Sequence, residues 1–535
     1  MRISDSGFNV QEFYGANHID KISKFSDIVQ DRYSIGRYQE QNWSLIPSNV
    51  DDRRRMHHLI LVEAVRIAGL LHDIGHPPFS HITEQALVQE IDRLPDFMRS
   101  KICKGRALHE QMGLEISEHV LSSCTQNAVE YKEIKVIISI IALGILSDGE
   151  FMESRGCKDR QVALFCQDLH SIMDSSFDSD RLDYVVRDAL NSGRDKRIEY
   201  NRIIQNMKLC RNCPDCSDVR FRFCPSIKIL NSIEEVLFAR YDGYVFVVYH
   251  HHAVKTNFIL SEVIRGLIQM NRDSVPHDIE IPGNITGLWW PMADNLTQLQ
   301  KSFVLCQWND SWLLTMIKKM YFKSLGTGEL DKMPAMLRLC LTELVTSRKC
   351  IYTLIKRKEH YRIIDRRVCS ALVSDDIRAV LDRIPSANDD DITVLLKSLC
   401  RSSDNLGGGF ITVTIRDILK AMPGYKNEYE SYCSIPKGLE RTHSNLRVVM
   451  NGISSGVSRS RPIFVYDESG ESHSFDRYSN IGKSLEMEIR GLPWFYLFSD
   501  EDMGGCLEEV LMAVGDEIGS RIHDQVFKLI ERKAI

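Results

Sequence analysis

Ionisable side chains gather in one short stretch of this sequence. Three histidines and two carboxylates lie within thirteen residues, directly after the apolar run 59–71: His72, Asp73, His76, His81 and Glu84. The adjacent His72 and Asp73 can ligate one ion only where the backbone turns both side chains toward the same point, as at the end of a buried helix. Gly75, Pro77 and Pro78 supply such an end, because glycine tolerates unusual dihedrals and proline stops a helix.

His81 and Glu84 lie three residues apart in the short segment 80–84, so a helix there would place both on one face. The simpler interpretation is a histidine-rich loop that caps a core helix. Against it stands the density of ionisable groups beside a strongly hydrophobic run, where an unpaired charge would be costly. The pattern therefore favours metal and phosphate chemistry at a helix end.

Helical periodicity dominates the elements that would position these groups. Residues 51–71 carry apolar side chains over a wide face suited to burial, and residues 134–146 are nearly all apolar, which predicts a central core helix. A third helix is predicted over residues 180–191, with Asp180 at its start. The runs 219–223 and 245–249 could be short strands or buried helix, because periodicity does not separate the two.

The composition is that of an ordinary globular protein, with 43% hydrophobic and 26% charged residues among 535. The formal net charge of −6 argues against a protein that coats nucleic acid through its global field. No apolar run approaches the ~20 residues needed to cross a bilayer, and the first residues contain no apolar core of a secretion signal. The 15 scattered cysteines are typical of reduced thiols, so we expect a cytoplasmic protein.

The chain exceeds the usual size of a single domain, so we expect a large core and a second lobe. We place a mainly helical catalytic lobe over residues 1–345 and a smaller α+β lobe over residues 346–535, where 461–470 is predicted to be a strand running into a turn. The predicted fold class is therefore mainly α. Basic residues interleaved with tyrosine and isoleucine in 356–367 are typical of a solvated helix face, with nucleic-acid contact the less favoured interpretation.

Four cysteines cluster apart from the others: Cys210, Cys213, Cys216 and Cys224. The first three have a spacing like that of a zinc knuckle, and Pro214 favours a tight turn there. A conventional zinc site has two separated pairs of ligands. Free thiols are therefore slightly favoured over structural zinc.

The segment 72–81, His-Asp-Ile-Gly-His-Pro-Pro-Phe-Ser-His, resembles the metal-binding signature of the HD phosphohydrolase superfamily. Within that superfamily it resembles the deoxynucleoside triphosphate triphosphohydrolases, which include dGTPases and SAM-and-HD-domain dNTPases. Two further segments match in the same order: Leu-His-Glu-Gln at 108–111 and Phe-Asp-Ser-Asp-Arg-Leu-Asp-Tyr-Val-Val-Arg-Asp at 177–188. The resemblance extends over about residues 15–255. A single His-Asp pair would mean little, whereas the ordered set is specific.

The resemblance implies a metal held by His72, Asp73 and Asp180, a mixed nitrogen and oxygen set suited to manganese, iron or zinc. The substrate phosphates could carry Mg²⁺ as well. Members of the family have a further histidine ligand upstream, but direct alignment puts Ser23 at that position. We expect His18 to act as the fourth ligand instead; the alternative is an incomplete site.

The resemblance also assigns roles around the metal. His109 and Glu110 match the family's catalytic pair. His76, His81 and Glu84 would surround the phosphate, with His81 as proton donor to the departing sugar oxygen and His109 oriented by Glu84 or Glu110. Residues at substrate-binding positions are Arg181, Arg240 and Lys255 for phosphate, and Tyr184, Asp188 and Tyr249 for the sugar. For Tyr249 a core aromatic is an equally good interpretation.

These matches imply a metal-dependent enzyme that hydrolyses deoxynucleoside triphosphates to deoxynucleoside and tripolyphosphate. Relatives in the family are commonly oligomeric and nucleotide-regulated, so we expect a homo-oligomer, with an interface or effector site in the C-terminal lobe. Two alternatives stay open. One is hydrolysis of another nucleotide or of single-stranded nucleic acid, and the other is a catalytically weak nucleotide sensor, which the departure at Ser23 favours.

Overall fold

The computed structural model describes most of the chain beyond residue 51. The described ranges are 52–102, 106–126, 132–155, 160–194, 196–211, 221–270, 285–289, 305–385, 390–405, 414–422, 435–450, 463–468, 471–482, 484–485 and 492–534. Helices dominate these ranges, and the strands within them form small antiparallel sheets. The fold class is therefore mainly α, as the sequence predicts.

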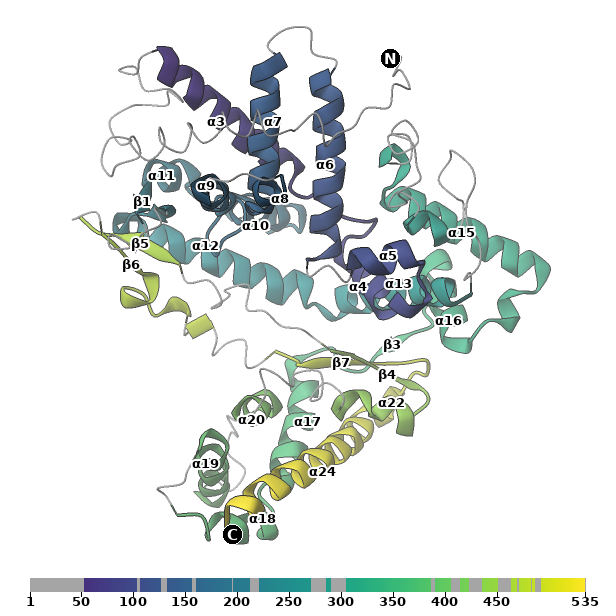
Figure 1. Ribbon diagram of the computed structural model, residues 1–535. Coiled ribbons are helices and arrows are strands. Elements are labelled where there is room, and N and C mark those ends of the chain that lie inside the picture. The colour runs from purple at the N-terminus through teal and green to yellow at the C-terminus, as the bar shows by residue number, and fades with distance from the viewer. Residues whose placement is uncertain are drawn as a thin grey trace. The chain divides into compact units, whose positions relative to one another are not determined.

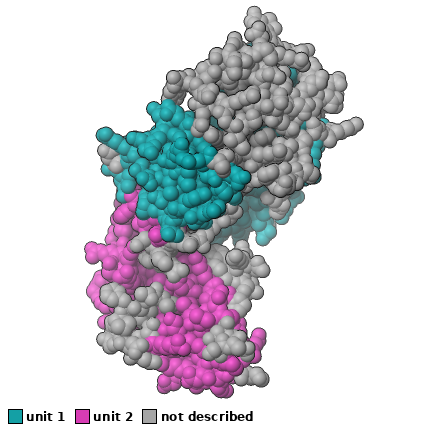
Figure 2. Space-filling view, turned by 90° about the vertical axis from the view of Figure 1, so that its left-hand side faces the viewer, with its two compact units in different colours: residues 1–240, 263–324, 457–481 teal, residues 241–262, 325–456, 482–535 magenta. Residues whose placement is uncertain are grey.

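The chain divides into two compact units, coloured separately in Figure 2. Unit 1 comprises residues 1–240, 263–324 and 457–481, and unit 2 comprises residues 241–262, 325–456 and 482–535. The predicted division at residue 345 into a catalytic and a C-terminal lobe stays a prediction.

Unit 1 is built around α7 (Lys132–Leu146), whose sequence after Lys135 is almost entirely apolar. Ile140, Ile141, Leu143 and Ile145 are completely buried. Among the described elements, α7 packs mainly against α3 (Asp52–Leu71), α6 (Leu108–Gln126) and α9 (Arg160–His170), as Figure 1 shows. The predicted central core helix is therefore confirmed, and it supports the two helices, α3 and α6, that carry the histidine-rich segments.

Other described elements complete unit 1. After α3 come α4 (His81–Gln89), α5 (Asp96–Ile102), α8 (Glu150–Ser154), α10 (Ser179–Asn191), α11 (Tyr200–Gln205), β1 (Met207–Arg211), β2 (Phe221–Pro225), α12 (Leu230–Gly243), the later part of α13 (His251–Met270), α15 (Asp310–Thr327), β5 (Phe464–Tyr466) and β6 (Ser472–Ser474). The predicted helix over 180–191 is confirmed as α10.

The two ambiguous apolar runs adopt different structures. The run 219–223 contributes to β2, which pairs with β1, so the strand interpretation holds for its described part. The run 245–249 lies in a π-helical turn, Tyr244–Val248, which ends at Tyr249. The predicted strand in 461–470 is β5, which pairs with β6 and belongs to unit 1.

Unit 2 has an α+β arrangement. A three-stranded antiparallel sheet has the order β3 (Tyr352–Thr353), β7 (Phe495–Ser499), β4 (Leu446–Met450), with β7 buried along its whole length. The long helix α24 (Leu507–Ala534) packs along α17 (Lys358–Ala371). The other helices are α16 (Ala335–Thr346), α18 (Asp375–Leu381), α19 (Asp391–Asn405), α20 (Ile415–Ala421) and α22 (Leu439–Thr442). No helix in the described ranges is both long enough and apolar enough to cross a membrane.

The predicted cysteine cluster is only partly described. Cys213 and Cys216 lie outside the described residues, as does the side chain of Cys210. Cys224 in β2 forms no disulfide within the described residues and is completely buried against Tyr466. A zinc site at these cysteines stays a prediction.

Candidate active site

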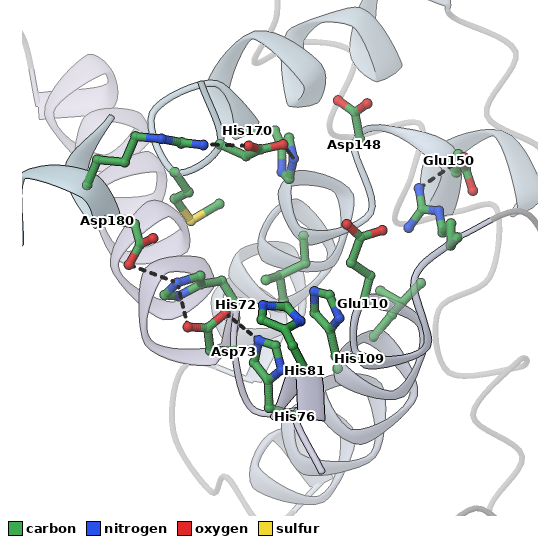
Figure 3. Close-up of a pocket in the computed structure, with 17 residues that line it drawn as sticks. His72, Asp73, His76, His81, His109, Glu110, Asp148, Glu150, His170 and Asp180 are labelled. Carbon is green, nitrogen blue, oxygen red and sulfur yellow. Dashed lines mark ion pairs between the residues drawn. The ribbon is translucent and has the colours of Figure 1, made fainter. Parts of the chain in front are cut away.

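The end of α3 directs the first histidine toward two carboxylates. His72 Nδ1 hydrogen-bonds to the carbonyl oxygen of Gly69 at 2.8 Å, which turns the other ring nitrogen away from the helix. His72 Nε2 lies 3.3 Å from Asp73 Oδ2 and 3.6 Å from Asp180 Oδ1 (Figure 3). The adjacent His72 and Asp73 thus face the same point, as expected at a helix end.

Gly75 allows the turn after α3 to lie directly on α6. A Cβ atom on Gly75 would overlap the backbone of α6 at His109 and Gly113. Only a residue without a side chain fits this approach. The contact sets the histidine-rich turn beside the first turn of α6, which carries His109.

Asp180 reaches the site from the first turn of α10. The preceding Asp178 caps this helix: its carboxylate accepts hydrogen bonds of 2.7 Å from the backbone N–H of Ser175 and of Arg181. The cap defines where α10 starts, because it satisfies N–H groups that lack a partner within the helix. Asp180 is therefore presented at the helix start, as the sequence predicts.

These three residues fit a bound cation. The nearby carboxylates of Asp180 and Asp73 raise the pKa of His72 to about 10, while His72 and His76 hold the pKa of Asp73 far below its usual range. His72 Nε2 is buried and has no hydrogen-bond partner among the described residues. One ligand atom from each of His72, Asp73 and Asp180 lies within 4.8 Å of the others. A divalent ion would satisfy both the buried nitrogen and the two carboxylates.

A second group of histidines lies beside the first. Ser80 Oγ is 2.9 Å from His76 Nδ1, and His76 Nε2 is 3.5 Å from Asp73 Oδ1, so His76 borders both groups. His81 and His109 share one carboxylate oxygen: Glu84 Oε2 is 3.3 Å from His81 Nδ1 and 3.0 Å from His109 Nδ1. The predicted helical spacing of His81 and Glu84 is confirmed in α4. Of the two predicted partners for His109, Glu84 makes the hydrogen bond.

The buried carboxylate of Glu84 keeps a proton on its partner. Burial by itself raises the pKa of Glu84, but the hydrogen bonds from His109 and His81 outweigh it and lower that pKa. Burial likewise lowers the pKa of His109, and Glu84 more than offsets this, so the net shift of the His109 pKa is upward. The pair therefore favours a charged imidazolium next to a carboxylate.

Ring geometry argues against a second ion held by the three histidines. One nitrogen from each of His76, His81 and His109 lies within 4.8 Å of the others. However, the rings of His76 and His109 are stacked, with centroids 4.1 Å apart and planes within 10°. An imidazole lone pair lies in the ring plane, so one ion cannot be in line with both. These groups are better placed to contact anionic oxygens.

Both groups open into one cavity of about 580 Å³ (Figure 3). Sequence reasoning missed several of the residues in its wall: Arg106, Asp148, Glu150, His170 and Asp174. Arg106 lies just before α6 and pairs with Glu150 at 3.0 Å. The position of Arg106 close to the matched segment 108–111 was the available signal. The others lie at or next to helix ends, in segments with no recognisable motif.

The predicted substrate residues of unit 1 are only partly brought together. Arg181 lines the cavity, as does Glu110, and the guanidinium of Arg181 is anchored by Asp178. Tyr184, Asp188 and Arg240 are not among the described residues that line it. Asp188 pairs with Arg187 at 3.7 Å, and Arg240 is buried in α12.

The other predicted residues lie elsewhere. Tyr249 and Lys255 belong to unit 2. Tyr249 packs against Leu492, and its carbonyl oxygen accepts a hydrogen bond from the hydroxyl of Tyr496, which agrees with its interpretation as a core aromatic. Lys255 is buried and paired with Glu343. His18 and Ser23 lie outside the described residues.

Comparison with known proteins matches the segment that builds most of this site. A family model described as HD domain matches residues 55–163. The deoxynucleoside triphosphate triphosphohydrolase SAMHD1 homolog of Dictyostelium discoideum is 24% identical over 37% of this chain and 32% of its own length. The deoxynucleoside triphosphate triphosphohydrolase SAMHD1 of Mus musculus is 27% identical over 27% of this chain and 22% of its own. The chain thus spans about a third or less of these two relatives.

A viral relative and a solved structure also resemble this chain. The putative HD domain-containing protein L394 of Acanthamoeba polyphaga mimivirus is 27% identical over 36% of this chain and 35% of its own length. The crystal structure of a hypothetical protein from Aquifex aeolicus aligns over 93% of this chain and 85% of its own at 16% identity, with a TM-score of 0.43. We conclude that this chain carries an HD domain within residues 55–163 and resembles, at low sequence identity, the deoxynucleoside triphosphate triphosphohydrolases.

Proposed function

We propose that this protein is a metal-dependent phosphohydrolase that converts deoxynucleoside triphosphates to deoxynucleosides and tripolyphosphate. One observation carries the proposal: a single cavity holds the cation-attracting group His72, Asp73 and Asp180 directly beside histidines that Glu84 orients. The names of the SAMHD1 relatives support the choice of substrate, although the likeness covers only part of each chain.

His72, Asp73 and Asp180 would hold the ion, with His18 proposed as a further ligand. A divalent transition metal bound there supplies a Lewis acid for a phosphoryl oxygen and lowers the pKa of an attacking water. Manganese, iron or zinc suits these ligands, and Mg²⁺ on the substrate phosphates would further offset charge.

The neighbouring histidines handle protons and phosphate charge. Glu84 holds the Nδ1 side of both His81 and His109, which leaves the opposite nitrogen of each ring available to substrate. His81 is the more exposed of the two, with 65% of its side chain accessible against 17% for His109. His81 therefore suits proton donation to the departing sugar oxygen, while His109, His76 and Glu110 would line the phosphate path.

Arg181 would contact the phosphate chain, because it lines the same cavity and its guanidinium is held in place by Asp178. Tyr184 and Asp188 are proposed to discriminate deoxyribose from ribose, and Arg240, Lys255 and Tyr249 to complete the substrate site. The homo-oligomeric state and the cytoplasmic location also remain predictions.

Product identification tests the proposal. Purified protein loaded with manganese is incubated with each deoxynucleoside triphosphate and its ribose counterpart, and the products are separated by chromatography. We expect deoxynucleoside and tripolyphosphate from the wild type. Asp180→Ala serves as the matched control, and it should lose both bound metal and activity because one anionic ligand is removed.

Other outcomes would redirect the assignment. Release of orthophosphate, pyrophosphate or nucleoside monophosphates would indicate another HD hydrolase or a nuclease. Full metal occupancy without turnover of any nucleotide would favour a nucleotide sensor. Unchanged metal content in Asp180→Ala would remove the proposed metal site.

A further inference from the structure

The turn that precedes α4 is held in a conformation that residues with a side chain rarely adopt. Phe79 has a φ of 59°, and Ser80 has a φ of 52° with a ψ of −126°. The second pair of angles falls in a region that essentially only glycine occupies at low cost. Such strain persists only where surrounding contacts enforce it.

This turn determines where two site histidines lie. Ser80 Oγ bonds to His76 Nδ1 at 2.9 Å, and His81 is the first residue of α4. Figure 3 shows both histidines in the cavity. A relaxed backbone at residues 79–80 would therefore move the ring of His81 and release that of His76. The positions of His76 and His81 therefore depend on the strained backbone conformation at residues 79–80.

Most of the restraining contacts are local. Ser80 N donates to the carbonyl of Pro77 at 2.7 Å, and the hydroxyl of Thr83 donates to the carbonyl of Pro78. A different kind of contact comes from far along the chain: the backbone N–H of Phe79 donates to Asp310 Oδ1 at 2.7 Å, across 231 residues. Asp310 is the first residue of α15 and belongs to unit 1, as the turn does.

Asp310 is not needed as the cap of its own helix. The neighbouring Asn309 performs that task, since Asn309 Oδ1 accepts the N–H of Trp312 at 3.0 Å. The carboxylate of Asp310 is thus directed to the turn, where a charged acceptor makes a stronger hydrogen bond than a neutral one.

We propose that Asp310 is a positioning residue of the active site, whose carboxylate holds the Phe79–Ser80 turn in its strained conformation and thereby places His76 and His81 in the cavity. The catalytic part of this inference rests on the proposed function, whereas the restraint on the turn does not.

Hydrogen exchange tests the restraint directly. In Asp310→Ala the amide of Phe79 should exchange faster than in the wild type, and in Asp310→Asn, which keeps an acceptor oxygen, it should stay close to the wild type. Asn309→Ala is the matched control, because it weakens the start of α15 without removing the bond to Phe79. Equal exchange at Phe79 in wild type and Asp310→Ala would overturn the proposal, as would the same acceleration in Asn309→Ala.

Enzyme kinetics test whether the restraint by Asp310 affects catalysis. We expect kcat of Asp310→Ala to fall about tenfold, with KM changed less than about twofold and metal content unchanged, because misplaced catalytic groups slow the chemical step. In a Phe79→Gly background, where glycine tolerates the positive φ, Asp310→Ala should reduce kcat by a smaller factor. An equal reduction of kcat in both backgrounds would contradict the argument that Asp310 restrains a strained turn. Absence of turnover in the wild type would overturn the proposed function alone, since the exchange experiment still decides the role of Asp310.

Discussion

At the scale of single residues, the site works through pairs that set each other's charge. Glu84 illustrates this, because its carboxylate lies against both His109 and His81 and overcomes the burial that would otherwise remove the proton from His109. Without a bound ion, Asp180 and Asp73 raise the pKa of His72 in the same way. The charge on His109 thus depends on a specific carboxylate, whereas an ion held by His72 would replace the proton on that ring.

Replacing Glu84 should shift the pH dependence of activity. The raised pKa of His109 means that its protonated form is present below that pKa and is lost as pH rises through it. In Glu84→Gln the charge is gone and burial lowers the pKa, so the alkaline limb of the kcat/KM profile should move to lower pH. Glu110→Gln, which removes a weaker interaction with His109, should move the limb less. A pH–rate series checks this, and an unmoved alkaline limb in Glu84→Gln would exclude a role for the His109 proton.

At the scale of elements, the contact between the turn after α3 and α6 brings the two histidine segments together. Gly75 approaches the backbone of α6 too closely for any side chain, whereas a Cβ at Gly113, on the other side of the same contact, would have its nearest neighbours at 3.5 to 3.8 Å. The requirement for glycine therefore falls on the turn and not on the helix, although the two residues face each other.

Two glycine-to-alanine variants should differ sharply. Gly75→Ala forces the turn away from α6 and should reduce the free energy of unfolding by ~1–3 kcal/mol, with loss of metal and activity. Gly113→Ala makes only ordinary contacts and replaces a glycine inside a helix, so it should be neutral or stabilising by up to ~1 kcal/mol. Thermal unfolding and metal analysis of both variants check this. Comparable stability of the two would show that the close approach is not maintained in solution.

At the scale of the whole molecule, stability also depends on a buried ionisable group of unit 2, outside the candidate site. Asp365 in α17 is 7% exposed, and its carboxylate accepts the backbone N–H of Ile415 at 2.9 Å, at the start of α20. Burial raises the pKa of Asp365 to about 7, against 3.8 for an unperturbed aspartate. Between these values the folded protein binds a proton that the unfolded chain does not, so folding becomes less favourable as pH rises through this window.

Asp365→Asn should remove this dependence, because asparagine stays neutral and can still accept the bond from Ile415. The variant should gain stability over the wild type at about pH 8 and much less at about pH 5, as measured by thermal unfolding. Asp382→Asn, at an exposed aspartate of unit 2, is the control and should show no such difference. If the difference in stability between Asp365→Asn and the wild type is the same at about pH 5 and about pH 8, Asp365 is ionised in the folded protein.

The features that the sequence by itself determined depend on local interactions along the chain. The apolar pattern predicted α3, α7 and α10, the glycine and prolines predicted the turn after His72, and three-residue spacing predicted that His81 and Glu84 share a face of α4. These features depend on neighbours within a few residues, which helical periodicity and turn chemistry report directly. The motif order also brought His72, Asp73, His109 and Asp180 forward as candidates, through resemblance.

The tertiary structure decided which of these groups meet. In the folded protein His109 hydrogen-bonds to Glu84 and not to Glu110, and its ring stacks on that of His76. Arg106 and His170 line the cavity. The fold also places Asp310 on the turn at Phe79. Such contacts join elements separated by many residues. They depend on how α3, α6 and α9 pack on α7, and on how the starts of α10 and α15 reach the turn after α3. Local spacing carries no information about that packing, because each helix would form with the same pattern in any arrangement.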